Sequence, residues 1–475
     1  MAKFDYDLLV LGGGAAGLVS SKVARGFGKS VAVIEKGKLG GECTNFGCVP
    51  SKALIRTAKA AHELKHLAAL GLSTDAPIAI NTGGAMRHVR SIVEKVYNTH
   101  LPASFKALGI DLSFGDPRFT DNYSVTMDGK TITANKIIIA TGSSPLIPSI
   151  EGIGKTPYLT NNTVFSLDTL PRSLAVLGGG PIGIELASAL NRLGVETTVV
   201  EMFDHILFRE DRELADMLAG KLLGEGLKFE TSAKAVKLAG DESRITLTTQ
   251  SNGGPRKEIT AQSILIASGR KPNTEGLDLE KAGVRHNHNG IEVDECLRTA
   301  SDNIYACGDV TGPYRFSHMA EYQSILACSN AFLPFKRRAD YRHVIWCTFT
   351  DPELAHAGLT EEEARAAHGG SIKVLRFDFS KIDRARTDIE EFGMSKVILD
   401  KKGKFLGAHI LGTHAAEVLH EIQLAKHFNI PFDRIWQAVH LYPSYSDVIR
   451  QSSKYHYADK MKNNPLIKLL KKVMG

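Results

Sequence analysis

The sequence predicts a three-domain α/β protein, in which two related doubly wound domains are followed by a smaller α+β domain. Its 475 residues are enough for about three domains at roughly 150 residues each. A pattern of strand, glycine-rich turn, helix, strand and acidic residue occurs twice, near residue 8 and near residue 174. From about residue 342 the glycine pattern is absent, and strand-like and helical stretches alternate.

The composition excludes several classes of protein. Hydrophobic residues make up 43% and charged residues 23%, as in ordinary globular domains. No apolar run reaches the roughly 18 residues of a membrane span, and Asp5 and Asp7 interrupt the stretch that a signal peptide would need. A net charge of only +6 argues against binding nucleic acid. We therefore expect a cytoplasmic protein with no nucleic-acid partner.

The first copy of the pattern predicts a dinucleotide site. The apolar run at residues 8–11 is followed by Gly12, Gly14 and Gly17, and the next apolar run ends at Glu35. The first glycine makes the tight turn, the second lets backbone approach a pyrophosphate, and the third lets helix and strand pack closely. The pyrophosphate then lies at the helix N-terminus, and the acid accepts a hydrogen bond from a ribose hydroxyl.

The second copy repeats these features and indicates which nicotinamide cofactor it takes. Gly178, Gly180 and Gly183 follow the run at residues 174–177, and Glu201 ends the next run. In both copies the first glycine precedes the acid by 23 positions. A carboxylate suits the free 2′-hydroxyl of NAD and repels the phosphate of NADP. With no basic residue in the next three positions, NAD(H) is preferred over NADP(H).

Later segments complete the expected domains. Each copy has a downstream strand that ends in glycine, KIIIATG at 136–142 and SILIASG at 263–269. In the third domain we expect strands at 373–379 and 395–399 and helices at 360–368 and 415–429.

Two cysteines form the candidate redox centre. Cys43 and Cys48 lie five positions apart in GGECTNFGCVPSK, residues 40–52, at a predicted loop-to-helix junction. The polar, glycine-rich surroundings argue against simple packing, and a zinc site would need a second clustered pair, so we expect no metal site. A reversible disulfide is the simplest account, because a helix N-terminus favours the thiolate that exchange requires.

This segment resembles the redox signature of the class I pyridine nucleotide-disulfide oxidoreductases, a family that includes dihydrolipoyl dehydrogenase and mercuric reductase. The resemblance extends from residue 5 to about residue 452. Further matching blocks are IIIATGSSP at 137–145, GGGPIGIE at 178–185, ASGRKPN at 267–273, YACGDVTG at 305–312 and TDPELAHAGLTEEEA at 350–364.

The resemblance implies a domain arrangement and a quaternary structure. A FAD-binding domain at 1–147 and 271–341 would be interrupted by an NAD(P)-binding domain at 148–270. These would be two Rossmann-like domains. Residues 342–475 would form a dimerisation domain, and the protein would be a homodimer.

The resemblance also implies residue roles. Cys48 would be the flavin-facing sulfur and Cys43 the sulfur that exchanges with substrate, while Lys52 would approach the flavin and pair with Glu185. Electrons would pass between nicotinamide, flavin and the Cys43–Cys48 disulfide. The residues that would hold FAD are Gly12, Gly14, Gly17, Glu35, Lys52, Thr141, Gly142, Gly308 and Asp309. Those that would hold NAD are Gly178, Gly180, Gly183, Glu201 and Gly269.

The chain departs from the family near its C-terminus. Most members have a His-Glu pair there that moves the substrate thiol proton, but this region reads HLYPSYSD, residues 440–447. Tyr442 stands in the histidine position and Asp447 in the glutamate position. A phenol with a pKa near 10 is a poor base at neutral pH. His440 is a candidate replacement, although a packed histidine is the simpler interpretation.

These observations predict a FAD-dependent NAD(P)H:disulfide oxidoreductase similar to dihydrolipoyl dehydrogenase, acting on a small-molecule or protein-bound disulfide or dithiol. Two alternatives stay open: a metal-ion or quinone reductase similar to mercuric reductase, and a non-enzymatic flavin-binding docking protein. The missing base puts lipoamide turnover in doubt.

The C-terminal segment PLIKLLKKVM, residues 465–474, predicts a short basic amphipathic helix. It either packs on the dimer or makes weak peripheral contact with an anionic membrane or an acidic partner.

Overall fold

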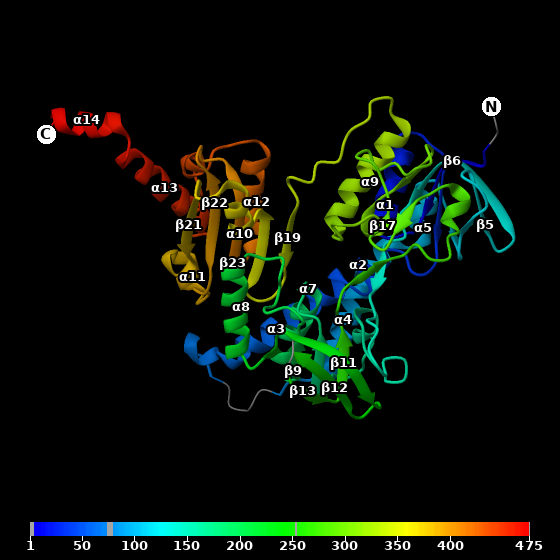
Figure 1. Cartoon of the computed structure of the whole chain (residues 1–475), viewed down its shortest axis with the longest axis horizontal. Helices are drawn as coiled ribbons and strands as arrows, with labels where there is room; N and C mark the ends of the chain where they lie inside the picture. The colour runs from blue at the N-terminus through cyan, green and yellow to red at the C-terminus, as the bar shows by residue number, and fades with distance from the viewer. Residues whose placement is uncertain (1–3, 74–78, 252–253, 475) are drawn as a thin grey trace.

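The computed structural model describes residues 4–73, 79–251 and 254–474. The chain folds into three bodies, with the N-terminal and C-terminal ones at opposite ends of the view in Figure 1 and the second domain below and between them. This is the predicted mixed α/β architecture with a separate C-terminal domain. Within the described ranges, no helix is both long and apolar enough to cross a membrane.

The first domain is built on a mostly parallel sheet. Its parallel strands lie in the order β3-β2-β1-β6, and β18 pairs with β6 on the far side. Leu11 of β1 lies between Ile34 of β2 and Ile139 of β6, and all three are buried. The strands are β1 (Tyr6–Leu11), β2 (Val31–Glu35), β3 (Ile110–Phe114), β4 (Arg118–Phe119), β5 (Ser124–Met127), β6 (Lys130–Ile139), β16 (His286–Asn287), β17 (Gly290–Ile291) and β18 (Ile304–Ala306).

Helices of the first domain carry both the glycine loop and the cysteines. α1 follows the glycine turn directly and packs on α9, while α3 packs on α4. The helices are α1 (Ala15–Gly26), α2 (Gly41–Asn45), α3 (Cys48–Lys65), α4 (Thr82–Tyr97), α5 (Pro102–Ala107) and α9 (Ser317–Phe332).

The second domain repeats the first on a smaller scale. Its parallel strands lie in the order β10-β9-β8-β14, beside an antiparallel sheet β11-β12-β13. The strands are β8 (Ser173–Leu177), β9 (Glu196–Val200), β10 (Lys228–Glu230), β11 (Ala233–Gly240), β12 (Ile245–Ser251), β13 (Arg256–Ala261) and β14 (Ser263–Ile266). The helices are α6 (Asn161–Val164), α7 (Pro181–Arg192) and α8 (Arg212–Gly224).

The second domain is connected through a two-stranded ribbon. β7 (Ser143–Pro145) leads out of the first domain and pairs antiparallel with β15 (Arg270–Pro272), which leads back. The two crossings therefore lie side by side. One apolar core then joins the domains, because buried Leu54 of α3 and Met86 of α4 pack in the same cluster as Leu186 of α7.

The third domain is a five-stranded antiparallel sheet in the order β19-β20-β23-β22-β21. Its strands are β19 (Ile345–Thr348), β20 (Glu353–Gly358), β21 (Ile372–Asp378), β22 (Met394–Asp400) and β23 (Phe405–Gly412). Its helices are α10 (Glu361–His368), α11 (Asp383–Thr387), α12 (Ala415–His427), α13 (Asp447–Lys462) and α14 (Pro465–Met474). The strands and helices expected there are present, with ends shifted by one or two residues.

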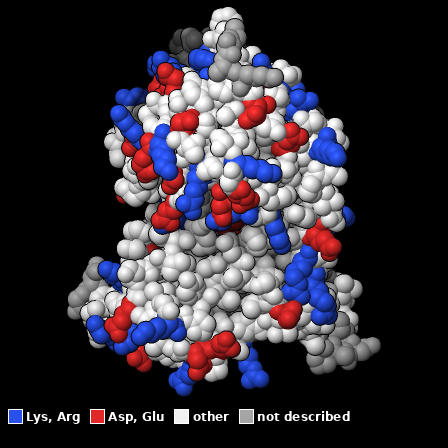
Figure 2. Space-filling model, turned by 90° about the vertical axis from the view of Figure 1, so that its right-hand side faces the viewer, with Lys and Arg blue, Asp and Glu red and all other residues white. Residues whose placement is uncertain are grey.

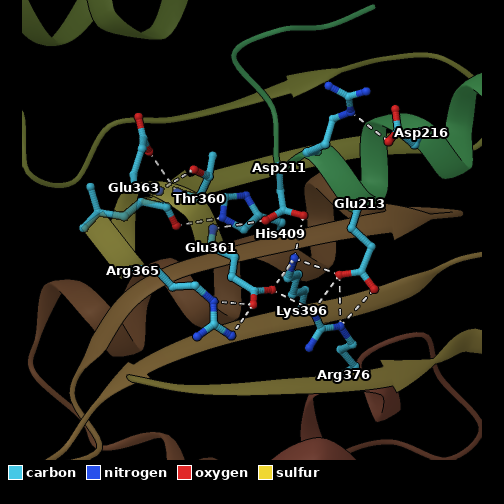
Figure 3. A network of polar contacts seen from close by, with 12 residues as sticks. Asp211, Glu213, Asp216, Thr360, Glu361, Glu363, Arg365, Arg376, Lys396 and His409 are labelled. Atoms are coloured by element: carbon cyan, nitrogen blue, oxygen red, sulfur yellow. Dashed lines mark hydrogen bonds and ion pairs between the residues drawn. The ribbon is translucent and has the colours of Figure 1, made fainter. Parts of the chain in front are cut away.

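A buried lysine joins the third domain to the second. Lys396 of β22, whose side chain is 3% exposed, lies 2.8 Å from Asp211, 2.8 Å from Glu213 and 2.7 Å from Glu361. Asp211 and Glu213 begin α8, and Figure 3 shows their carboxylates converging with Glu361 on the ammonium group. Arg376 of β21 also donates to Glu213, at 2.9 Å. None of these charges is buried alone, so separating the two domains would leave Lys396 or Asp211 without its partner.

Replacing Lys396 with Met should destabilise the protein, since it leaves Asp211 buried without its cation. Removing one partner of a buried ion pair costs about 3–5 kcal/mol, and Arg376 will offset little of this because it contacts the other carboxylates. The midpoint of thermal unfolding should fall by several degrees. Lys402→Met, at an exposed turn, is the matched control and should leave the midpoint unchanged. Equal midpoints for both variants would refute this role for Lys396.

Candidate active site

The two glycine loops are shaped by backbone contacts that allow no side chain. Gly12 has φ +108°, and a Cβ there would lie 2.4 Å from the carbonyl oxygen of Ala140. A Cβ on Gly17 would lie 1.8 Å from the carbonyl oxygen of Gly12. The second loop repeats this geometry at Gly178 and Gly183, with corresponding distances of 2.4 Å and 2.0 Å. The first and third glycines are therefore required by the fold itself.

The middle glycines are different, because the protein does not fill the space beside them. A Cβ on Gly180 would meet no atom within 4 Å, and one on Gly14 would only approach Gly41 at 3.7 Å. Each residue is the N-cap of its helix, α1 or α7, and no described side chain caps either helix. Bare helix N-termini beside open backbone suit a pyrophosphate. Both sites therefore fit a dinucleotide.

Backbone amides, including those of the glycine loops, hold the two acidic residues, Glu35 and Glu201, in place. Glu35 accepts hydrogen bonds from the amides of Gly13 at 2.5 Å and Gly37 at 2.6 Å. Glu201 accepts from the amide of Gly179 at 2.6 Å and that of Phe203 at 3.0 Å. Each carboxylate oxygen still has a lone pair for a ribose hydroxyl.

The remaining residues expected at the FAD site lie where the domains cross. Thr141 donates to the carbonyl of Asn273 at 2.7 Å, and the amide of Asn273 donates to the carbonyl of Gly142 at 3.0 Å. Asp309 follows Gly308 in the turn after β18 and accepts from the hydroxyl of Ser143 at 2.6 Å. Gly269, which was expected at the NAD site instead, immediately precedes β15, at the return from the second domain.

The two cysteines lie in two consecutive helices rather than in a loop. Cys43 is inside the short helix α2, which the sequence did not indicate, and Cys48 is the first residue of α3. Neither sulfur is in a disulfide in this structure. Cys48 is exposed, and its sulfur lies 3.5 Å from the hydroxyl of Ser317 in α9.

The environment ionises one thiol and not the other. A hydrogen bond from Cys43 lowers the pKa of Cys48 to about 6, helped by Ser317 and the charge of Lys52. The same hydrogen bond, together with burial, raises the pKa of Cys43. At neutral pH the pair therefore carries one thiolate, on Cys48, and one proton, on Cys43.

Lys52 and Glu185 join the redox helix to the second domain. The Lys52 ammonium lies 2.7 Å from the Glu185 carboxylate and 4.4 Å from the ring centre of Phe349. The other carboxylate oxygen accepts from the amide of Phe349 at 2.8 Å. Burial lowers the pKa of Lys52, but the charge and hydrogen bond of Glu185 outweigh it, so the pKa is raised. The lysine is thus a fixed cation beside Cys48.

Several residues near the site were not identified from the sequence. Arg270 lies in the family-like segment ASGRKPN, residues 267–273, and pairs at 2.7 Å with Glu42, the residue before Cys43. Ser317 contributes from α9 of the same domain and Cys347 from β19 of the third domain, and burial raises the pKa of Cys347. The resemblance to the family could have suggested Arg270. No sequence signal could have suggested Ser317 or Cys347, because both are far from Cys48 in the sequence and reach the site only through folding.

The C-terminal candidates do not form a proton relay within one chain. Tyr442, 70% exposed, donates to Asp383 of α11 at 2.8 Å, and this hydrogen bond raises the pKa of the phenol. Asp447 is buried and accepts from Arg450 at 2.6 Å. His440 contacts the carboxylate of Glu421 at 2.7 Å and the carbonyl of Ala438 at 2.8 Å, so both ring nitrogens are used.

Among the described residues, no group of three or more His, Cys, Asp or Glu side chains could hold a resident metal ion.

Comparison with known families accounts for nearly the whole chain. Residues 6–330 match the family described as pyridine nucleotide-disulphide oxidoreductase. Residues 344–453 match its dimerisation domain.

Individual relatives have different activities. The chain is 33% identical to a mercuric reductase of Lysinibacillus sphaericus, over 92% of this chain and 80% of the relative. It is 34% identical to a dihydrolipoyl dehydrogenase of Thermus scotoductus, over 94% and 97%. Among solved structures, the Cu(II) complex of the HOCl-induced flavoprotein disulfide reductase RclA from Escherichia coli matches with a TM-score of 0.84 and 29% identity, over 96% and 100%.

Replacing Cys43 should reveal its effect on Cys48. Cys43→Ala removes the hydrogen-bond donor, so the pKa of Cys48 should rise by about one unit or more from its value near 6. Cys43→Ser keeps a donor and should raise it less. Ultraviolet thiolate absorbance of the reduced holoprotein against pH measures both. A pKa of Cys48 that stays near 6 in Cys43→Ala would mean that Cys43 does not stabilise the thiolate.

Proposed function

The chain belongs to the pyridine nucleotide-disulphide oxidoreductase family, and on this premise we propose that it is an NADH-dependent reductase whose cysteine pair delivers electrons to a thiophilic metal ion. It is a FAD-dependent disulfide oxidoreductase, as its family and relatives are. The proposal concerns the nicotinamide, the roles of individual residues and the terminal acceptor.

The first glycine loop suits FAD and the second suits NADH. Gly14 and Gly180 leave helix N-termini open to a pyrophosphate, and Glu35 and Glu201 each keep acceptor capacity for a ribose. Bound FAD would supply the step that takes two electrons from the nicotinamide and passes them to the disulfide. Glu201 supports NADH, since its fixed carboxylate would repel a 2′-phosphate.

The chain's own residues would then hold charge at defined atoms. Lys52 keeps a cation beside Cys48, and Glu185 holds that cation in place. Cys48 is the thiol stabilised as a thiolate, whereas Cys43 keeps its proton. This division supports a role for Cys48 on the flavin side and for Cys43 on the acceptor side.

The state of the C-terminal residues carries the proposal for a metal acceptor. Reducing a bound disulfide releases a thiolate that a side chain must protonate, and oxidising a dithiol requires a base. Tyr442 is engaged with Asp383, and both nitrogens of His440 are occupied. A soft metal ion needs no such group, because binding to the two sulfurs displaces the remaining proton into solvent.

The net reaction balances without a further reactant. NADH gives two electrons and releases NAD⁺ and one proton. The electrons reduce one Hg(II) to Hg(0), or two Cu(II) to two Cu(I). Relatives named mercuric reductase and the Cu(II) complex of RclA support this class of acceptor.

A disulfide acceptor such as lipoamide is the second candidate. The alignment covers 97% of a dihydrolipoyl dehydrogenase but 80% of a mercuric reductase, so the chain's length fits the former better. This function would need a proton donor that one chain does not supply.

We propose a homodimer as the functional unit. The segment before α13 exposes apolar side chains, with Val439 fully exposed and Leu441 86% exposed, in a domain that matches the family's dimerisation domain. Exposed apolar groups of this size favour burial against a partner.

Steady-state rates with alternative acceptors test the acceptor. NADH oxidation should be at least about tenfold faster with Hg(II) or Cu(II) than with lipoamide. Cys43→Ser and Cys48→Ser should abolish metal reduction, whereas Tyr442→Phe should leave it unchanged. Tyr442→His should raise the lipoamide rate about tenfold or more, since it provides a base. A wild-type rate that is higher with lipoamide would favour the second candidate.

Nicotinamide preference tests Glu201. The wild-type kcat/KM should favour NADH over NADPH by about tenfold or more, and Glu201→Gln should narrow the ratio because it removes the repelling charge. Glu196→Gln, at the exposed first residue of β9, the strand that Glu201 follows, is the control. Equal kcat/KM for both nicotinamides in the wild type would contradict the assignment.

A further inference from the structure

The last helix is a separate element that starts anew after α13. α13 ends at Lys462, and α14 begins at Pro465 with its own cap, because the Asn464 side chain accepts from the amide of Leu466 at 2.9 Å. Proline at the first helical position favours this restart. Figure 1 shows α14 extending from the end of α13, away from the sheet of the third domain.

α14 presents apolar side chains to solvent. Leu466 is 69% exposed and Val473 is 77% exposed. They are seven positions apart, so two helical turns bring them to the same side. The sequence has leucine at positions 469 and 470 between them, which completes an amphipathic spacing. A ten-residue helix is only marginally stable alone, so such a stripe favours packing against a surface.

Nearly all of the chain's net charge lies in the C-terminal half of α13 and in α14. The last 22 positions hold six lysines and one aspartate, a net +5 of the whole chain's +6. The rest of the protein is almost neutral, and Figure 2 shows basic and acidic side chains interspersed over the face at the opposite end. A concentration of one sign beside apolar groups points to a negatively charged, partly apolar surface.

We propose that α14 docks the protein on an anionic lipid bilayer. The apolar positions 466, 469, 470 and 473 would enter the boundary between headgroups and acyl chains, and the lysines would contact lipid phosphates. A second copy of the chain fits less well, since two lysine-rich helices repel each other. An acidic soluble protein would satisfy the lysines but leaves the apolar stripe unexplained.

Vesicle co-sedimentation of the holoprotein tests this proposal. Binding should be at least about tenfold stronger to an equal mixture of phosphatidylcholine and phosphatidylglycerol than to phosphatidylcholine alone, and should weaken with salt. Reversing the charge at Lys468, Lys471 and Lys472 with Glu should abolish it. The matched control reverses Lys401, Lys402 and Lys404, which are exposed in the turn between β22 and β23. That variant should bind as the wild type does.

A second variant separates insertion from simple charge attraction. Leu466→Ser with Val473→Ser keeps every lysine, and its vesicle binding should fall about tenfold or more. Unchanged binding of this variant would overturn docking by insertion.

The oligomeric state distinguishes docking from a role in the dimer. A chain ending at Asn464 should keep the wild-type number of subunits, measured from the molar mass in solution, and the wild-type NADH-dependent rate. Fewer subunits, with no vesicle binding by the full chain, would instead make α14 part of the subunit contact and overturn the proposal.

Discussion

The ion pair between Lys52 and Glu185 is the contact on which the arrangement of the redox centre depends. Lys52 belongs to the helix that starts with Cys48, and Glu185 to the helix that starts at the second glycine loop. One carboxylate oxygen holds the lysine and the other accepts from the backbone of Phe349 in the third domain. A single glutamate thus aligns the thiolate, the nicotinamide loop and the C-terminal domain.

Further charged groups repeat this arrangement along the domain borders. The carboxylate of Asp351 pairs with Lys59 of α3 at 3.0 Å, and its backbone carbonyl accepts a hydrogen bond from Arg192 of α7 at 2.7 Å. Lys396 lies among the carboxylates at the start of α8. Buried ion pairs add little net stability compared with apolar packing, but they penalise any shift that separates the partners. Their contribution here is therefore to the relative position of the domains, which a site assembled from three of them requires.

Much of the fold could be predicted because short segments of the sequence determine it. The turn itself requires glycine at Gly12 and Gly17, because a Cβ at either position would collide with backbone atoms. The same pattern recurs at Gly178 and Gly183, and this repetition predicted two related domains. The cysteine spacing likewise singled out Cys43 and Cys48, which lie in the adjoining helices α2 and α3. The partners of these residues were not predictable, since Ser317 reaches Cys48 across 269 positions and Asp383 reaches Tyr442 across 59. Such contacts depend on packing between distant segments, which has no local signature.

The unequal thiols fix how many protons accompany the electrons. With the pKa of Cys48 near 6 and that of Cys43 raised, reducing the disulfide at neutral pH takes up two electrons and one proton. The midpoint potential of such a couple falls by about 30 mV per pH unit, half the slope of a fully protonated dithiol. Reduction of NAD⁺ also consumes two electrons and one proton and has the same slope. The driving force between nicotinamide and the cysteine pair is therefore nearly independent of pH in this range, so a change in acidity would alter the rates of individual steps without reversing the direction of electron flow.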